Sequence, residues 1–283
     1  ALYSNSTGAQ NVAVGKQALY TNTGTGNTAT GYQAMYFNTS GGSNAAYGFA
    51  ALQSNTTGSY NTAIGQSALL YNTTASYNTA VGYQANYGTG STTGNSNAVT
   101  IGYQAGFSSW TGTVGSTIIG YQAGYSVNQP DGLTLVGYKA GYKVDNSVNS
   151  NNADTYVGHT AGYNTTSGSN NTALGDSALF SNITASNNTA VGYQAGYAVT
   201  GGYNTIVGAG ATGSTGSGLS GSYNTLMGYG TGNSLSSGSN NTFIGTLGSS
   251  NYCGASITTG SKNTIIGGYG GNQGGLDIRT ASN

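Results

Sequence analysis

A five-residue motif that ends in glycine recurs along the chain, and this repeat limits the possible folds more than any other feature. It appears as Asn-Val-Ala-Val-Gly at 11–15, Asn-Thr-Ala-Ile-Gly at 61–65 and Asn-Thr-Ile-Ile-Gly at 263–267. Its last residue, called the repeat glycine here, occurs fifteen times, at Gly15, Gly31, Gly48, Gly65, Gly82, Gly102, Gly120, Gly137, Gly158, Gly175, Gly192, Gly208, Gly228, Gly245 and Gly267. The commonest spacing is 17 residues, and longer spacings add residues between motifs. A fixed motif with insertions in one place is typical of a solenoid.

The residue types in the motif favour β-strands over helices. Relative to the repeat glycine, position −3 is usually Thr, position −2 is Ala or a larger apolar residue, and position −1 is Val, Ile, Leu or Met in thirteen copies. Such short segments, rich in β-branched residues and bounded by Gly, Asn and Ser, are typical of strands. A glycine within each turn of a helix would destabilise it by roughly 1 kcal/mol per copy.

We therefore predict an all-β fold, a parallel β-solenoid of about fifteen coils over 1–271. Residues 272–283 are expected to begin a C-terminal linker. Each coil should contain a short strand, a bend at the repeat glycine, a second short strand and a loop. The fifteen glycines should stack in one column as structural turn residues, because they recur at one point of every repeat.

Composition excludes several functional classes. Only 4% of the residues are charged, with five basic and five acidic side chains, so no basic surface is available for nucleic acid. No apolar run is long enough to insert into a membrane, and the segment that begins at Ala1 has no signal-peptide pattern. The single cysteine, Cys253, cannot form an intrachain disulfide.

Catalytic, metal-binding and cofactor-binding residues are not expected. His159 is the only histidine, and Asp176 occupies the same position in the next repeat, so the two should form a solvated surface contact. The five Asp residues do not recur at a repeat position, as a calcium-binding solenoid requires. The chain has too few ionisable groups for a catalytic constellation, and we predict that it is not an enzyme.

Asparagine and tyrosine also recur with the repeat. The asparagines at position −4 should form a hydrogen-bonded ladder between coils; they are Asn11, Asn27, Asn61, Asn78, Asn171, Asn188, Asn204, Asn224, Asn241 and Asn263. The 24 tyrosines should stack in ladders, with binding of cell-surface glycans by exposed rings as the alternative. Asn-x-Ser/Thr sequons recur in expected loops, at Asn5, Asn38, Asn55, Asn72, Asn164 and Asn182.

The two apolar residues before each repeat glycine predict association of the chain with copies of itself. Successive side chains of a strand point to opposite faces, so one column fills the coil and the other faces outward. We expect the outward column to be the one that is mostly Ala in the first half of the chain and larger in the second. An outward apolar stripe of this length favours contact with identical chains.

Two known repeat families have similar motifs. The segment Asn-Thr-Ala-Val-Gly-Tyr-Gln-Ala at 188–195 resembles the head repeat of trimeric autotransporter adhesins. The Gly-Tyr-Gln-Ala-Gly-Tyr variants at 102–107, 120–125 and 192–197, and the ending at 270–283, more closely resemble bacteriophage tail-fibre arrays. The resemblance implies a left-handed β-roll and a homotrimer. The repeat here is longer than the adhesin repeat, and its Asn lies one residue nearer the glycine.

The function implied is that of a structural shaft in a trimeric fibre, located in a virion tail fibre that supports host attachment. Its partners would be its own copies, other fibre or tail proteins and, through exposed tyrosines, cell-surface glycans. One alternative is a bacterial surface adhesin or extracellular fibril. Another is an ice-binding solenoid, although Thr occurs only once per motif beside apolar neighbours.

Overall fold

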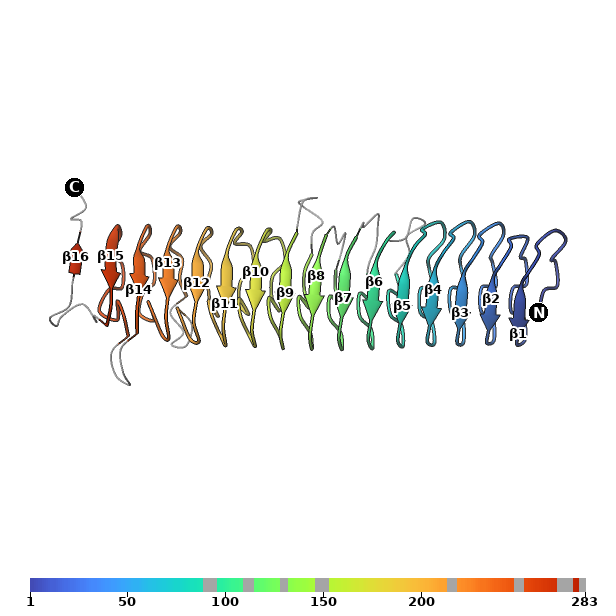
Figure 1. Ribbon diagram of the computed structural model, residues 1–283, viewed down its shortest axis with the longest axis horizontal. Helices are drawn as coiled ribbons and strands as arrows, with labels where there is room; N and C mark the ends of the chain where they lie inside the picture. The colour runs from blue at the N-terminus through green and yellow to red at the C-terminus, as the bar shows by residue number, and fades with distance from the viewer. Residues whose placement is uncertain are drawn as a thin grey trace. The chain divides into compact units, whose positions relative to one another are not determined.

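A computed structural model describes residues 1–88, 96–108, 115–127, 132–145, 153–212, 218–246 and 252–268, and the backbone of 277–279. The chain divides into two compact units, residues 1–152 and 153–283, which are described separately. Within each unit the coils follow one another in chain order (Figure 1). No helix is assigned in the part of the chain that the structure describes.

Each repeat contributes one short strand that ends just before its repeat glycine. The first unit contains β1 (Val12–Val14), β2 (Thr28–Thr30), β3 (Ala45–Tyr47), β4 (Thr62–Ile64), β5 (Thr79–Val81), β6 (Val99–Ile101), β7 (Thr117–Ile119) and β8 (Thr134–Val136). The second contains β9 (Thr155–Val157), β10 (Thr172–Leu174), β11 (Thr189–Val191), β12 (Thr205–Val207), β13 (Thr225–Met227), β14 (Thr242–Ile244), β15 (Asn263–Ile266) and β16 (Asp277–Arg279).

Within each unit, consecutive strands pair in parallel and in register, which confirms the predicted parallel β-solenoid. Ala63 of β4 is opposite Ala80 of β5, and Ile206 of β12 is opposite Leu226 of β13. The pair β15–β16 differs, because it is antiparallel.

The longer spacings do not disturb this pairing where the structure describes it. The register continues from β5 to β6, from β12 to β13 and from β14 to β15, across the insertions before Gly102, Gly228 and Gly267. The central residues of those insertions, and of the one before Gly158, lie outside the described residues.

The prediction of a second strand after each repeat glycine is wrong. That segment is a series of turns, in which positions +2 and +4 adopt left-handed backbone angles, as at Gln17 (φ 62°) and Leu19 (φ 48°). It still hydrogen-bonds to the next coil, since the Leu19 N–H donates to the Ala34 carbonyl at 3.0 Å. Alternating left-handed residues curl the chain, whereas a strand would keep it extended.

The repeat glycines lie one against the next and form one column within each unit. Their φ values, from 104° to 142°, lie in a region that L-residues rarely adopt. A Cβ atom on Gly15 would lie 2.6 Å from the carbonyl oxygen of Gly31, and one on Gly175 would lie 2.4 Å from that of Gly192. Both the turn and the close approach of neighbouring coils therefore require glycine.

The expected assignment of the inner and outer columns is reversed. The column at position −2, with Ala46, Leu135 and Ile206, is buried inside the coils. The column at position −1 faces outward, as Val14 and Ile64 do. The Ala-rich column lies inside because the coil is narrow and the side chain at position +4 shares the same interior.

A compensation in volume keeps this interior filled. In the Gly48 coil, the small Ala46 at position −2 accompanies Leu52 at position +4, and both are fully buried. In the Gly137 coil, Leu135 at position −2 accompanies Gly141 at position +4. A Cβ atom on Gly141 would lie only 2.7 Å from Leu135 Cδ2. In these two coils large and small residues exchange places, and the packing stays close.

The predicted Asn ladder at position −4 is confirmed. The backbone N–H of Asn27 donates to Asn11 Oδ1 at 2.8 Å, and that of Asn188 donates to Asn171 Oδ1 at 3.0 Å. Sequence reasoning omitted Asn44, which belongs to the same column. These amides satisfy buried backbone groups at the corner of each coil.

A second Asn column lies at position +7 and was not predicted. The Asn55 amide donates to Asn38 Oδ1 at 2.6 Å, and the Asn72 amide donates to Asn55 Oδ1 at 2.9 Å. The side chains of four sequon asparagines in the expected loops, Asn38, Asn55, Asn72 and Asn182, are buried. The recurrence of Asn5, Asn22, Asn38, Asn55 and Asn72 at intervals of 16 or 17 residues could have indicated this column.

Candidate interaction surface

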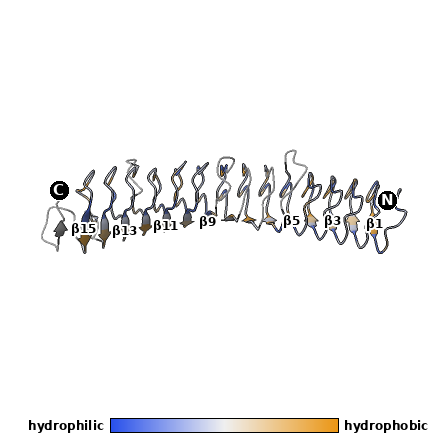
Figure 2. Ribbon diagram, turned by 90° about the horizontal axis from the view of Figure 1, so that it is seen from above, coloured by the Kyte–Doolittle hydropathy of each residue, from blue (hydrophilic) through white to orange (hydrophobic). Residues whose placement is uncertain are grey.

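The outward face of the strands is the most regular surface of the molecule. Strand alternation directs positions −3 and −1 outward in every coil, so a column that is mostly Thr runs beside a column that is mostly Val, Ile or Leu. No charged residue occupies either column in β1–β15. Hydrophobic colours gather on the strand arrows, whereas the turns are mostly hydrophilic (Figure 2).

Several large apolar side chains of this face are exposed. Val14 is 57% exposed, and Leu174 and Met227 are exposed in the second unit. A monomeric soluble protein rarely keeps a continuous apolar strip in contact with water. This strip, called the outer apolar column here, is therefore the first candidate for an interaction surface.

Aromatic rings form ladders beside this face, as predicted. At position +1, Tyr83, Tyr103, Tyr121 and Tyr138 stack with centroid separations of 5.1–5.3 Å and interplanar angles of 7–13°. A second ladder at position +5 includes Tyr87, Phe107, Tyr125 and Tyr142 in the first unit, and Tyr163, Phe180 and Tyr197 in the second. Such offset stacks stabilise the surface by about 0.5–1.5 kcal/mol per pair.

Stacking determines what the position +1 ladder can offer to a ligand. Each ring within the stack is covered on its faces by its neighbours, so only the ring edges and phenol hydroxyls reach solvent. The Gln104 amide donates to Gln84 Oε1 at 2.8 Å, and the Gln122 amide donates to Gln104 Oε1 at 2.9 Å. The ladder therefore presents hydroxyl and amide groups rather than ring faces. Glycan binding by these tyrosines stays a prediction.

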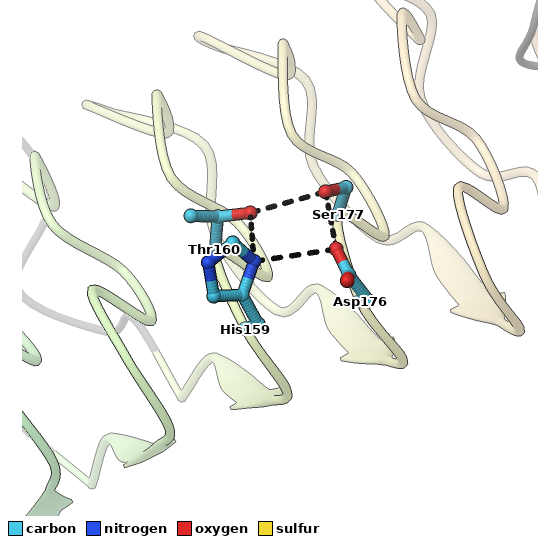
Figure 3. A network of polar contacts seen from close by, with 4 residues as sticks. All are labelled: His159, Thr160, Asp176 and Ser177. Atoms are coloured by element: carbon cyan, nitrogen blue, oxygen red, sulfur yellow. Dashed lines mark hydrogen bonds and ion pairs between the residues drawn. The ribbon is translucent and has the colours of Figure 1, made fainter.

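A polar network interrupts the aromatic column in the second unit. His159 and Asp176 occupy position +1 of adjacent coils, and His159 Nδ1 lies 3.4 Å from Asp176 Oδ1, which confirms the predicted contact (Figure 3). Ser177 Oγ donates to Asp176 Oδ1 at 2.6 Å, and Thr160 Oγ1 lies 3.1 Å from Ser177 Oγ. Because the Ser177 hydroxyl is directed to Asp176 and not to His159, the histidine does not activate it as a nucleophile.

Within the described ranges, no group of three or more His, Cys, Asp or Glu side chains could hold a metal ion. No helix in those ranges is long and apolar enough to cross a bilayer. Cys253 is buried and forms no disulfide, and its thiol lies 4.0 Å from the carbonyl oxygen of Ile265.

Comparison with known proteins gives no relative. No family model, no curated protein and no solved structure matches the chain. The repeat and its outer surface are therefore the features that bear on function.

Proposed function

We propose that this chain is a structural shaft of a trimeric fibre and has no catalytic role. The observation that carries the proposal is the outer apolar column, which is exposed on strands of both units and contains no charged residue. Removing one Val or Ile side chain from water contributes roughly 1.5–3 kcal/mol. One such side chain per coil, repeated along the array, favours association with identical chains.

The outer apolar column supports self-association, and the similarity of the motifs to phage tail-fibre arrays supports three copies and a place in a virion tail fibre. Other fibre or tail proteins would then be partners at the ends of the array. A bacterial surface adhesin or extracellular fibril is the alternative within the same structural class. The half-buried, outward-facing Thr column favours a different second candidate, an ice-binding face, which needs a monomer with the same surface open to water.

Two adjacent residues of β13 provide the test. Leu226 is fully buried in the coil, whereas Met227 belongs to the outer apolar column and is 42% exposed. Met227→Asp should dissociate the trimer into folded monomers, because it places a charge in the buried interface. Leu226→Asp should unfold its coil, and Ile206→Asp and Ile265→Asp should act in the same way.

Sedimentation velocity and light scattering on the purified chain measure the assembly, and circular dichroism measures the fold. A wild-type chain that is a stable monomer at micromolar concentration contradicts the fibre proposal. Thermal hysteresis of ice growth in that monomer, abolished by Met227→Asp or Thr225→Leu, would then support the ice-binding candidate.

A further inference from the structure

One ladder position carries a carboxyl group where the other coils of the second unit carry amides. Asp154 occupies position −4 of the Gly158 coil, and its side chain is completely buried. The Asn171 backbone N–H donates to Asp154 Oδ1 at 2.7 Å, just as the Asn188 N–H donates to Asn171 Oδ1. One carboxyl oxygen therefore performs the same role as the amide oxygen that it replaces.

The second carboxyl oxygen lies where the ladder needs a donor. In the neighbouring coil, Asn171 Nδ2 donates to the carbonyl of Ala185, fourteen residues further along the chain, at 3.0 Å. Asn61 donates in the same way to the carbonyl of Ala75. The corresponding carbonyl for Asp154 is that of Gly168, and Asp154 Oδ2 is buried without a hydrogen-bond partner. An ionised carboxylate would direct one acceptor toward another, whereas a proton on Oδ2 would supply the missing donor.

The groups around Asp154 offer no compensating positive charge. Tyr156 is the other buried titratable residue of this coil, and it donates its hydroxyl proton to Thr165 Oγ1 at 3.2 Å. His159 and Asp176 are exposed on the outer surface and contact each other. Among the described side chains of the second unit, the one lysine, Lys262, lies in the Gly267 coil.

We propose that Asp154 makes the contact between the Gly158 and Gly175 coils a proton-dependent joint. The ladder is complete when the carboxyl group carries a proton, and the joint weakens when the carboxyl group is ionised. This inference does not depend on the fibre proposal, because it concerns the interior of one chain.

The direction of the pH dependence follows from the pKa. Burial raises the pKa of Asp154 from 3.8 to about 7, and the Asn171 backbone N–H, the Tyr156 hydroxyl and the Asn171 side chain oppose part of this rise. Between these two values the folded state binds a proton that the unfolded state has lost, so stability falls as pH rises. Below this pH window the protonated ladder contributes its full stabilisation to the folded state, and above about pH 7 that stabilisation is completely lost.

The test is amide hydrogen exchange of the full-length chain, measured for peptides that cover 153–175 at pH 5 and pH 8 and corrected for intrinsic exchange. A local measurement is needed because repeat proteins open coil by coil. In the wild type, the opening of these amides should increase by about tenfold to a hundredfold from pH 5 to pH 8. Asp154→Asn should abolish this increase, because its amide restores the donor.

Asp176→Asn is the matched control, since it removes the same charge from the exposed surface of the next coil. It should leave the pH dependence as in the wild type. The proposal is overturned if Asp154→Asn retains the wild-type pH dependence, or if it opens more readily than the wild type at pH 8. If this variant does not fold, the carboxyl ¹³C shift of Asp154 in the wild type decides, and a titration midpoint near 4 contradicts the joint.

Discussion

Two sets of coils in the first unit fill the same cross-section with different chemistry. The Asn-lined coils, those of Gly31, Gly48 and Gly65, combine Ala at position −2 with Leu or Met at position +4 and Asn at positions −4 and +7. The aliphatic coils, those of Gly120 and Gly137, combine Ile or Leu at position −2 with Gly at position +4 and Val at position +7. The strands stay in parallel register through both sets. The backbone path is therefore compatible with two different interiors, provided that the total volume is conserved.

The backbone carries different strain in the two sets. In the Asn-lined coils, position +4 is a leucine or methionine with positive φ, as at Leu52 (φ 53°). A left-handed conformation at a residue of this kind costs roughly 1–2 kcal/mol. In the aliphatic coils, glycine adopts the same conformation with little strain, as at Gly141 (φ 58°). The Asn-lined coils offset their strain by burying the large side chain and by making two hydrogen-bonded ladders.

The largest effect on stability is expected when a large residue typical of the Asn-lined coils is placed at position +4 of an aliphatic coil. Gly141→Leu places a large side chain against Leu135, with the first new atom only 2.7 Å from Leu135 Cδ2. We expect a loss of roughly 3–5 kcal/mol from overpacking and left-handed strain. The loss of stability is measured by chemical denaturation followed by circular dichroism. Hydrogen exchange of the peptides around 134–145 shows whether it is local to this coil.

The double variant Gly141→Leu/Leu135→Ala rebuilds the Ala and Leu pairing of the Asn-lined coils. It should recover more than half of the loss, and the coupling between the two sites in a double-mutant cycle should be stabilising. Simple addition of the two single losses would contradict the idea that volume is exchanged between these positions.

The second prediction compares the residues at position +7. Asn55→Ala leaves the buried Asn38 Oδ1 without the donor that Asn55 supplies and removes one of the two donors to the Gly58 carbonyl, which keeps Asn44 Nδ2; it should destabilise the protein by roughly 2–4 kcal/mol. Val144→Ala removes only apolar contacts and should cost about 1–2 kcal/mol. The free energies of unfolding of both variants test this order, and the reverse order would contradict the role given to the ladder.

The smallest expected effect is a gain in stability. The position +1 aromatic column is continuous from Tyr83 to Tyr138, but in the Asn-lined coils Gln66 separates Phe49 from Tyr83. Gln66→Tyr should join these rings and stabilise the protein by about 0.5–1 kcal/mol. Thermal unfolding measures the gain, with Gln66→Ala as the control for loss of the glutamine. A neutral or destabilising Gln66→Tyr would show that this ladder contributes nothing at the gap.

The sequence predicted the repeat, the parallel register and the Asn ladder, because each depends on residues that recur at one spacing. The predicted assignment of the inner and outer apolar columns was wrong, since the alternation of a three-residue strand permits both assignments. The side chain at position +4 decides between them, and that side chain follows a turn whose left-handed residues have no simple sequence signal. Leu52 and Gly141 differ in type but have the same backbone conformation.

The sequence contains signals for two further features that the sequence analysis did not identify. The inverse relation between positions −2 and +4 is visible when Ala46 and Leu52 are compared with Leu135 and Gly141. Asp154 also falls in register with the Asn ladder. Its burial depends on the fold of the coil, so its raised pKa could not be read from the register alone.

The close approach of successive repeat glycines restricts how such a protein changes its length over evolution. A deletion from one repeat glycine to the next leaves every remaining glycine opposite another glycine. A deletion that shifts the motif out of register places a side chain where a carbonyl oxygen now lies, as at Gly15 and Gly31. The number of coils therefore changes only by whole repeats, whereas the segments between motifs tolerate added residues, as before Gly102, Gly228 and Gly267. Unequal recombination between near-identical stretches of the gene would change the length of the array in steps of about 4.8 Å, the spacing of adjacent strands.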